Sequence, residues 1–369
     1  MFDVVFGVVM LRYFDNAAAA RPEPEVLDFY LQAMREDFAN QEAIHLLAYQ
    51  ARRNLDHAAR ELCETFFDEP ELYQVVWSGS ATECFRIAAS YSGKSRIVSC
   101  NAEHPALTAN FKRYCDLHLL KINSSGAVIL PEPTPAADAV IFHHVQSETG
   151  VIQNLPALFS AFPTALKMVD AVQSAGKLPL VQSADLQIIS GVKFGAPGGA
   201  AILWKKTAEK LQKFPAFVSA MRSSDYALSR VNVPQCRTLA FAAALRKKQQ
   251  AADLARVEQL NLRLRHQLSQ IGILPLLPED TPVSPYIANF FLPGIQAAVV
   301  VRALAESSIF CASGSACAAE AGGPSPALLA LGKSRKDAFS GLRISFDGMT
   351  TENDVDFLAF ELKKVLKNY

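Results

Sequence analysis

The sequence predicts an α/β protein, with a mostly parallel sheet in a large domain flanked by helices and a smaller α+β domain towards the C-terminus. Two patterns predict this fold. Short apolar, β-branched runs alternate with longer segments of helical period, which is typical of a parallel sheet covered by helices. The segment from about Pro234 to Gln270 contains no glycine and, after Pro234, no proline, which predicts a long helix that connects the two domains.

Six runs are expected to form strands of the sheet in the large domain. They are Val75–Trp77, Arg96–Ser99, Ala139–Phe142, Leu166–Val169, Leu186–Ile189 and Ala200–Trp204. Ahead of the first run, Leu55, Ala59, Leu62 and Phe66 follow one another at steps of four, three and four residues, which places one apolar face of a helix in the core.

The length of 369 residues is that of about two domains, and half of the residues are hydrophobic, so a large core can form. We expect the large domain over residues 14–245 and the small domain over residues 246–369, with residues 1–13 packed with the small one. The apolar run from Val4 to Leu11 is expected to be the first strand, because it is too short to span a bilayer.

The charges of the chain argue against polyanionic partners. Lysine and arginine total 36, as do aspartate and glutamate, without any block of one sign. We therefore expect no nucleic acid and no membrane as partners, and a small molecule as substrate. The seven cysteines are scattered, without CxxC pairs or zinc-like Cys/His spacing, so no metal site is expected and a reducing, cytoplasmic compartment fits.

Three stretches carry candidate chemistry. Gly79-Ser80-Ala81-Thr82 follows a strand and opens a helix, where backbone N–H groups can hold a phosphate, although a capping serine explains it equally well. Asp170 directly follows a predicted strand, so it is either a helix cap or a carboxylate for a protonated ring nitrogen. Lys193, in the small-residue stretch after the next strand, is either a solvated loop lysine or a Schiff-base lysine. Together they meet the requirements of pyridoxal phosphate.

The chain resembles the class V aminotransferase group of fold type I pyridoxal-phosphate enzymes, and within it the NifS-like cysteine desulfurases. The resemblance runs nearly from end to end. The matching motifs lie at residues 13–18, 40–45, 79–83, 103–106, 144–150, 170–176, 190–193, 232–234, 313–317 and 342–345. It implies a fold type I transferase fold.

The resemblance also implies a role for each matching position. Lys193, Cys317 and His104 would be catalytic: Lys193 forms the Schiff base, His104 stacks on the cofactor ring and Cys317 accepts sulfur. Asp170 would hold the ring nitrogen and Gln173 the ring oxygen. The other expected cofactor-binding residues are Ser80, Ala81, Thr82, Ser147, Ser190 and Arg230, and the expected receivers of the substrate carboxylate are Asn16 and Arg343.

These implications lead to one expected activity and its rivals. The expected enzyme converts L-cysteine to L-alanine and leaves a persulfide on Cys317; it is a homodimer, and a sulfur-acceptor protein is a further expected partner. The rivals are a selenocysteine lyase or an aminotransferase in which Cys317 is incidental, and a non-catalytic sulfur-assembly partner. A nucleotide-binding protein using the glycines near Gly198 is disfavoured, because no GxGxxG or P-loop arrangement is present.

The chain departs from the family pattern at three places. Val192 stands where a histidine is usual before the lysine, and Ser147 where an asparagine is usual. Residues 227–232 rewrite the segment that reaches the neighbouring subunit's cofactor in the family. We expect Arg230 to replace the missing histidine across the dimer interface, with a surface arginine as the equal alternative. The remaining histidines, His143 among them, are expected to be satisfied or surface groups.

Overall fold

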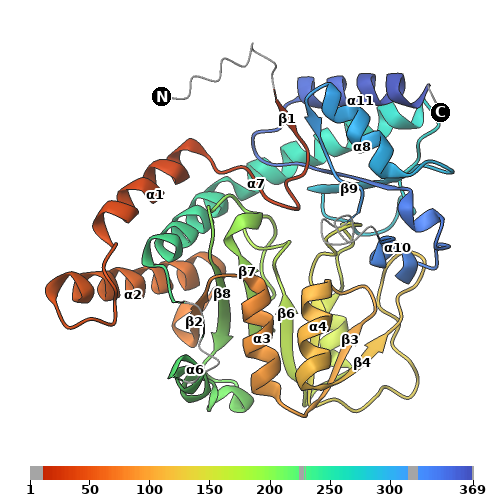
Figure 1. The fold of residues 1–369 in the computed structure, drawn as a ribbon. Coiled ribbons are helices and arrows are strands. Elements are labelled where there is room, and N and C mark those ends of the chain that lie inside the picture. The colour runs from red at the N-terminus through yellow and green to blue at the C-terminus, as the bar shows by residue number, and fades with distance from the viewer. Residues whose placement is uncertain (1–10, 224–227, 229, 315–322, 368–369) are drawn as a thin grey trace. The chain divides into compact units, whose positions relative to one another are not determined.

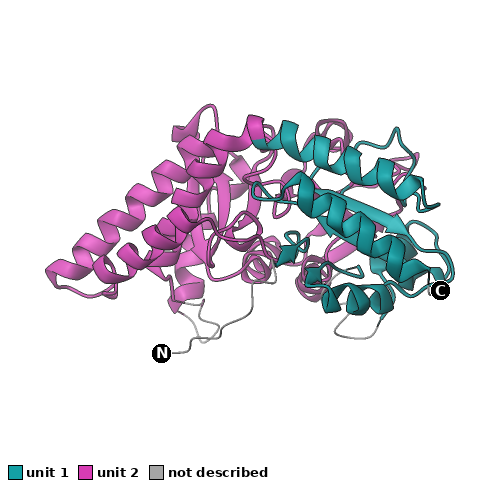
Figure 2. Cartoon of the chain, turned by 90° about the horizontal axis from the view of Figure 1, so that it is seen from above, with its two compact units in different colours: residues 1–18, 147–150, 253–369 teal, residues 19–146, 151–252 magenta. Residues whose placement is uncertain are grey.

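The structure is a computed structural model that describes residues 11–223, 228, 230–314 and 323–367 (Figure 1). The chain forms two compact units (Figure 2). Unit 2 contains Ala19–Gln146 and Val151–Ala252, and unit 1 contains Ser147–Gly150 together with the described parts of Met1–Ala18 and Asp253–Tyr369. This division differs from the expected boundaries: residues 14–18 and 147–150 belong to unit 1, and the later boundary lies at residue 252 rather than 245.

Unit 2 is built on a seven-stranded sheet with the order β2-β8-β7-β6-β5-β3-β4. The strands are β2 (Tyr73–Ser78), β3 (Arg96–Cys100), β4 (Asp116–Leu120), β5 (Ala139–His143), β6 (Leu166–Asp170), β7 (Leu186–Ser190) and β8 (Ala200–Lys205). All neighbouring pairs are parallel except those that β8 makes with β7 and β2. The predicted α/β fold and each of the six predicted strands are confirmed.

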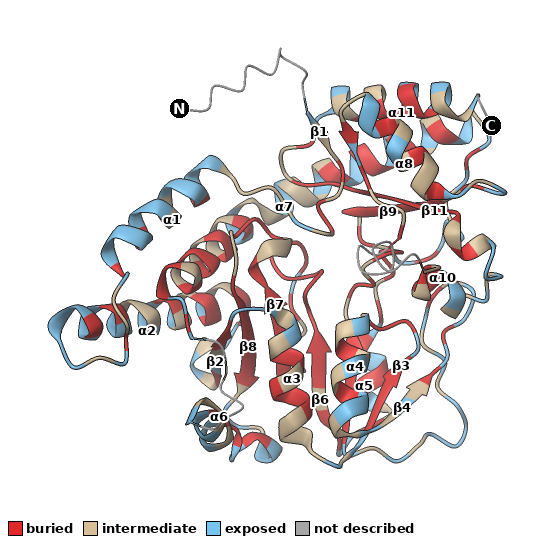
Figure 3. Cartoon of the chain, viewed as in Figure 1, coloured by how far each residue is buried: buried red, intermediate tan, exposed pale blue. Residues whose placement is uncertain are grey.

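The helices of unit 2 each bury some apolar side chains, and α3 and α4 pack on the sheet. They are α1 (Pro24–Glu36), α2 (Leu46–Phe66), α3 (Ala81–Ser92), α4 (Pro105–Tyr114), α5 (Leu155–Ser160), α6 (Phe214–Ser223) and the first half of α7 (Val233–Ser269). Phe85 of α3 and Phe111 of α4 belong to the same buried cluster as Ile141 and Ile188 of the sheet. The central strands β6 and β7 are largely buried (Figure 3). In α2, Leu62 and Phe66 are buried as expected, whereas Leu55 and Ala59 are half-buried.

Unit 1 is an α+β unit around a short antiparallel pair, β9 (Ile287–Phe291) with β11 (Gly341–Ser345). A second pair is parallel, β1 (Arg12–Tyr13) with β10 (Ile309–Phe310). The helices α8 (Ala297–Glu306), α10 (Pro326–Ala330) and α11 (Glu352–Leu366) and the second half of α7 complete it. Except for Leu11, the run expected as first strand lies outside the described residues.

The long helix predicted from the sequence is confirmed as α7, which runs from Val233 to Ser269. Its first half belongs to unit 2 and its second half to unit 1, because the boundary between the units falls at residue 252. Across the part of the chain that the structure describes, no helix has the length and apolar character needed to cross a membrane.

Candidate active site

The carboxyl ends of the parallel strands gather the candidate residues of unit 2. Asp170 is the last residue of β6, and Ser190 is the last residue of the parallel neighbour β7. Parallel strands end at the same edge of a sheet, which is where open α/β sheets bind ligands. Both side chains are buried, at 7% and 6% exposure. The sheet therefore brings a buried carboxylate and a hydroxyl to one edge.

Lys193 follows Ser190 on a tight 3-10 turn, Gly191–Lys193. The Gly191 N–H donates to the Gly199 carbonyl at 2.9 Å. A Cβ at position 191 would lie 2.6 Å from the Gly198 carbonyl oxygen, so only glycine allows this approach. The small residues around the lysine thus pack the turn against the following chain. This gives the glycines near Gly198 a packing role.

The Lys193 ammonium acts electrostatically on both Asp170 and His104. Burial raises the pKa of Asp170 to about 7, and Lys193 is among the groups that lower it. Burial also lowers the pKa of His104, and Lys193 lowers it further. The His104 Nδ1 accepts the Ala106 N–H at 3.1 Å, so a neutral His104 carries its proton on Nε2. A lysine, a carboxylate and a neutral aromatic ring are therefore close together.

The start of α3 lies on the surface, with Ser80 and Thr82 exposed and Ala81 half-exposed. The Ser80 hydroxyl caps the helix by accepting the Glu83 N–H at 3.2 Å, which confirms the capping interpretation. Capping by one side chain is compatible with anion binding, because several N–H groups of a first helical turn point along the axis. Gln173, three residues after Asp170, is buried, and its Oε1 accepts from Lys177 Nζ at 3.5 Å.

Comparison with known proteins identifies the family of this chain. A family model described as aminotransferase class-V matches residues 12–358. The chain belongs to the aminotransferase class-V family. The cysteine desulfurase IscS of Pseudomonas entomophila is 25% identical over 377 residues, covering 96% of this chain and 92% of the relative. The cysteine desulfurase of Gluconacetobacter diazotrophicus is 25% identical, covering 93% and 90%. A NifS-like protein from Rickettsia africae shares the fold, with a TM-score of 0.83 at 19% identity, covering 97% of this chain and 99% of that one.

The cofactor of this class V chain is pyridoxal phosphate, and the residues of unit 2 fit it. A carboxylate as buried as Asp170 needs a cation to stay ionised, and a protonated pyridine nitrogen supplies one. Lys193 offers the amine, His104 a flat neutral ring and the start of α3 a place for phosphate. When bound, pyridoxal phosphate supplies an electron-withdrawing ring that stabilises negative charge at the substrate Cα.

The two residues expected to bind the substrate carboxylate lie together in unit 1. Asn16 is fully buried and donates to the Ser345 carbonyl at 3.0 Å. Arg343, on β11, is 2% exposed and pairs with Asp15 Oδ1 at 2.7 Å while also donating to the Ser147 carbonyl at 3.0 Å. Asp15 has no role in the sequence prediction, although it directly precedes Asn16. The guanidinium is thus oriented by a carboxylate and a carbonyl of its own unit.

Cys317 lies outside the described residues, as do Ala227 and Ser229. The residues on either side of that segment are described. Gly314 adopts a positive φ of 86°, and a Cβ there would lie 3.1 Å from Glu148 Oε2. The Ser325 hydroxyl donates to the same carboxylate oxygen. Glu148 therefore contacts the chain on both sides of residues 315–322. Arg230 is an exposed residue ahead of α7.

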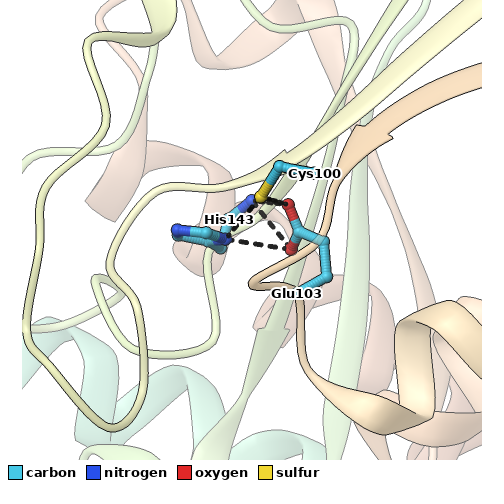
Figure 4. Close-up of side chains that lie close together, drawn as sticks. All are labelled: Cys100, Glu103 and His143. Atoms are coloured by element: carbon cyan, nitrogen blue, oxygen red, sulfur yellow. Dashed lines mark hydrogen bonds and ion pairs between the residues drawn. The ribbon is translucent and has the colours of Figure 1, made fainter. Parts of the chain in front are cut away.

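One cluster of three buried side chains was not predicted from the sequence. Cys100, Glu103 and His143 lie within hydrogen-bonding distance of one another (Figure 4). The expectation that His143 is a satisfied histidine is confirmed. Glu103 precedes the predicted His104 in the chain, and His143 stands opposite Asp170 in the β5–β6 register. The place of Glu103 beside His104 was a signal available in the sequence, whereas the place of His143 beside Asp170 depends on the strand register.

Proposed function

We propose that the chain is a cysteine desulfurase that converts L-cysteine to L-alanine and passes the sulfur to Cys317. The observation that carries this proposal is the full-length match to curated cysteine desulfurases, which leaves less than a tenth of this chain uncovered. The candidate residues fit the chemistry. The runner-up activities, a selenocysteine lyase and an aminotransferase, use the same cofactor and are distinguished by their products.

The proposed reaction needs no external oxidant or reductant. The Cβ–S bond of cysteine breaks, a C–H bond replaces it, and the sulfur forms an S–S bond with the Cys317 thiolate. The products are alanine and a persulfide, so that atoms and electrons balance. In this scheme Lys193 takes the proton from the substrate Cα, and Asp170 keeps the ring nitrogen charged. Arg343 and Asn16 receive the substrate carboxylate, with Asp15 orienting the guanidinium.

The decisive experiment is to incubate the purified holoenzyme with L-cysteine and a reductant and to quantify alanine and sulfide. We expect equimolar alanine and sulfide. Activity with L-selenocysteine but not L-cysteine would support a lyase, and a keto acid formed from an amino acid would support an aminotransferase. A protein that binds the cofactor yet forms no product with any of these would be a non-catalytic partner.

We propose that the enzyme is a homodimer, because α1 and the start of α2 are largely exposed (Figure 3) and carry large apolar side chains. Of the fifteen large apolar side chains that the described residues expose, eight lie between residues 27 and 49. Leu27, Leu31 and Met34 follow one another at steps of four and three, which makes a stripe along α1. Monomeric proteins rarely expose contiguous apolar surface of this kind, so a second copy is its proposed occupant.

Light scattering is expected to give the mass of a dimer. Leu31→Glu should weaken association at least about tenfold, because it places a charge in the apolar stripe. Leu262→Glu is the matched control, since Leu31 is 55% and Leu262 54% exposed, and it should leave the mass unchanged. A monomer that keeps full activity would contradict the dimer and the shared active site.

The dimer gives Arg230 its proposed role. Val192 occupies the position of a usual phosphate partner, and Arg230 would replace it from the neighbouring subunit. Arg230→Ala is expected to lower cofactor affinity by about ten- to a hundredfold if one charge-assisted hydrogen bond is lost. Combining it with Val192→His should restore part of that loss. Fluorescence titration with pyridoxal phosphate measures the cofactor affinity of the single and the double variant. Unchanged affinity in Arg230→Ala would show that Arg230 is a surface arginine without a role in cofactor binding.

A further inference from the structure

Three buried side chains next to Asp170 have no part in the proposed chemistry. Cys100 ends β3 and His143 ends β5, while Glu103 follows Cys100 by three residues. The strand order places β5 between β3 and β6, so these groups continue the line of strand ends that Asp170 begins. The Glu103 side chain is 0% exposed and that of His143 4%. A buried carboxylate in this position requires an explanation.

Glu103 is surrounded by hydrogen-bond donors. The His143 backbone N–H lies 3.1 Å from Oε1 and 3.2 Å from Oε2. The His143 ring contributes Nδ1, 3.1 Å from Oε2, and the Cys100 thiol donates to Oε1 at 3.2 Å. Donors on both oxygens are what an ionised carboxylate needs inside a protein. The cluster is therefore built to hold a negative charge (Figure 4).

Gln153 determines where the His143 ring carries its proton. Its Oε1 accepts the Val128 N–H at 3.1 Å and its Nε2 donates to the Gly126 carbonyl at 2.7 Å, so the amide orientation is fixed. That same Nε2 lies 3.3 Å from His143 Nε2 and can only donate to it. The neutral ring thus has its proton on Nδ1, directed at Glu103.

Opposing effects act on the protonation of the neutral His143 ring to its cation. Burial disfavours it, but the Glu103 and Asp170 carboxylates outweigh burial and raise the pKa of His143. The Gln153 amide opposes this protonation, because it could accept from Nε2 only by giving up both backbone partners. The hydrogen bonds of Gln153 therefore favour the neutral ring as the resting form. At alkaline pH the ring is neutral on either account.

The same geometry argues against a metal ion in this cluster. The ligand atoms of Cys100, Glu103 and His143 lie within 4.8 Å of one another, which is close enough to share an ion. A metal on His143 Nδ1 would move the ring proton to Nε2, where a metal-bound histidine normally donates to an acceptor. Gln153 presents a donor there instead. A closed hydrogen-bond network fits the cluster better than a metal site.

The charge of this cluster acts on Asp170. The pKa of Asp170 is raised to about 7, mainly by burial, and Glu103 contributes to this rise. The Val172 N–H, His143 and Lys193 act in the opposite direction. Glu103 thus increases the proton affinity of the Asp170 carboxylate, the group expected to pair with the cofactor ring nitrogen.

We propose that Glu103 is a positioning residue for the cofactor, whose buried negative charge holds the proton that Asp170 shares with the ring nitrogen. A carboxylate and a pyridine nitrogen in contact share one proton, and a nearby negative charge favours that proton on either partner. The proposal rests on pyridoxal phosphate and on no particular substrate. Its failure would therefore leave the proposed desulfurase activity untouched.

The test is a pH titration of the holoenzyme carrying pyridoxal phosphate labelled with ¹⁵N in the ring. The nitrogen chemical shift reports the ring proton without any turnover. In Glu103→Gln, the pH at which this proton is lost should fall by about one unit or more, as expected for removal of a nearby charge. Above that pH the variant should bind the cofactor about tenfold more weakly, since one unit corresponds to a factor of ten.

Matched variants separate charge from geometry. Cys100→Ser keeps a donor to Glu103 and Glu103→Asp keeps the charge, so both should titrate close to the wild type. An unchanged midpoint in Glu103→Gln would overturn the proposal, as would equal shifts in Glu103→Gln and Glu103→Asp.

If the Glu103→Gln variant fails to retain the cofactor, the proposal can still be tested by titrating Asp170 in the cofactor-free chain. ¹³C NMR of labelled aspartate follows the Asp170 carboxyl, which Asp170→Asn identifies in the spectrum. Its titration should move to lower pH in Glu103→Gln, because the raising effect of Glu103 is gone. An Asp170 titration that does not move would overturn the proposal.

Discussion

Replacing Lys193 with alanine is expected to abolish covalent attachment of the cofactor and to reduce turnover by at least about a hundredfold, the lower bound for loss of a catalytic acid–base group. The half-buried lysine is the amine that acts on both Asp170 and His104. Its removal should also raise the pKa of Asp170, because the lysine's lowering effect is lost. Borohydride reduction followed by peptide mass spectrometry measures the attachment directly.

Lys177 provides the matched control for this experiment. It is a buried lysine of the same unit, and its Nζ lies 3.5 Å from Gln173 Oε1. Lys177→Arg should keep the reduced cofactor on the peptide that contains Lys193. Finding the cofactor on a different lysine in the wild type, or on none, would show that Lys193 has been assigned wrongly.

Replacing Cys317 with serine is expected to abolish the protein persulfide and sulfide release while leaving cofactor binding intact. The hydroxyl is a far poorer nucleophile towards sulfur than a thiolate. The six cysteines that the structure describes are poor alternatives, because burial raises the pKa of each thiol. They are Cys63, Cys84, Cys100, Cys115, Cys236 and Cys311.

Cys311 is the matched control, since it precedes Cys317 by only six residues. It is 7% exposed, and burial raises the pKa of its thiol to about 12, with Asp15 adding to the effect. Cys311→Ser should therefore keep the persulfide, which mass spectrometry of the alkylated protein detects. Undiminished sulfide release by Cys317→Ser would assign the sulfur acceptor to another group.

The strands that the sequence predicts are those whose runs are rich in apolar and β-branched residues. β4 escaped prediction because it is an edge strand, in which Asp116 and His118 are exposed and Leu117 and Leu119 half-buried. The connection between β7 and β8 is too short for β8 to run parallel to β7. Only nine residues separate Ser190 from Ala200, too few for the helical crossover that a parallel neighbour requires.

Some residues of the candidate site could likewise be predicted from the sequence, and others could not. Lys193, Asp170 and His104 could be predicted because each stands in a local stretch with its own chemical meaning. Glu103 and His143 could not be predicted as partners, because their contact depends on the ends of β3 and β5 lying side by side. The two residues are 40 positions apart in the chain. Such pairs become visible only when the register between strands is known.

The close approach of Gly191 to the Gly198 carbonyl limits how this enzyme can be altered by directed evolution. A library that varies residue 191 would consist mostly of clones that cannot close the lysine turn, since even one added methyl group meets the backbone at 2.6 Å. The amine therefore has a fixed point of attachment. New substrate preferences would have to be selected elsewhere, for example around Asp15 and Ser147, whose contacts with Arg343 involve groups that can be exchanged or moved.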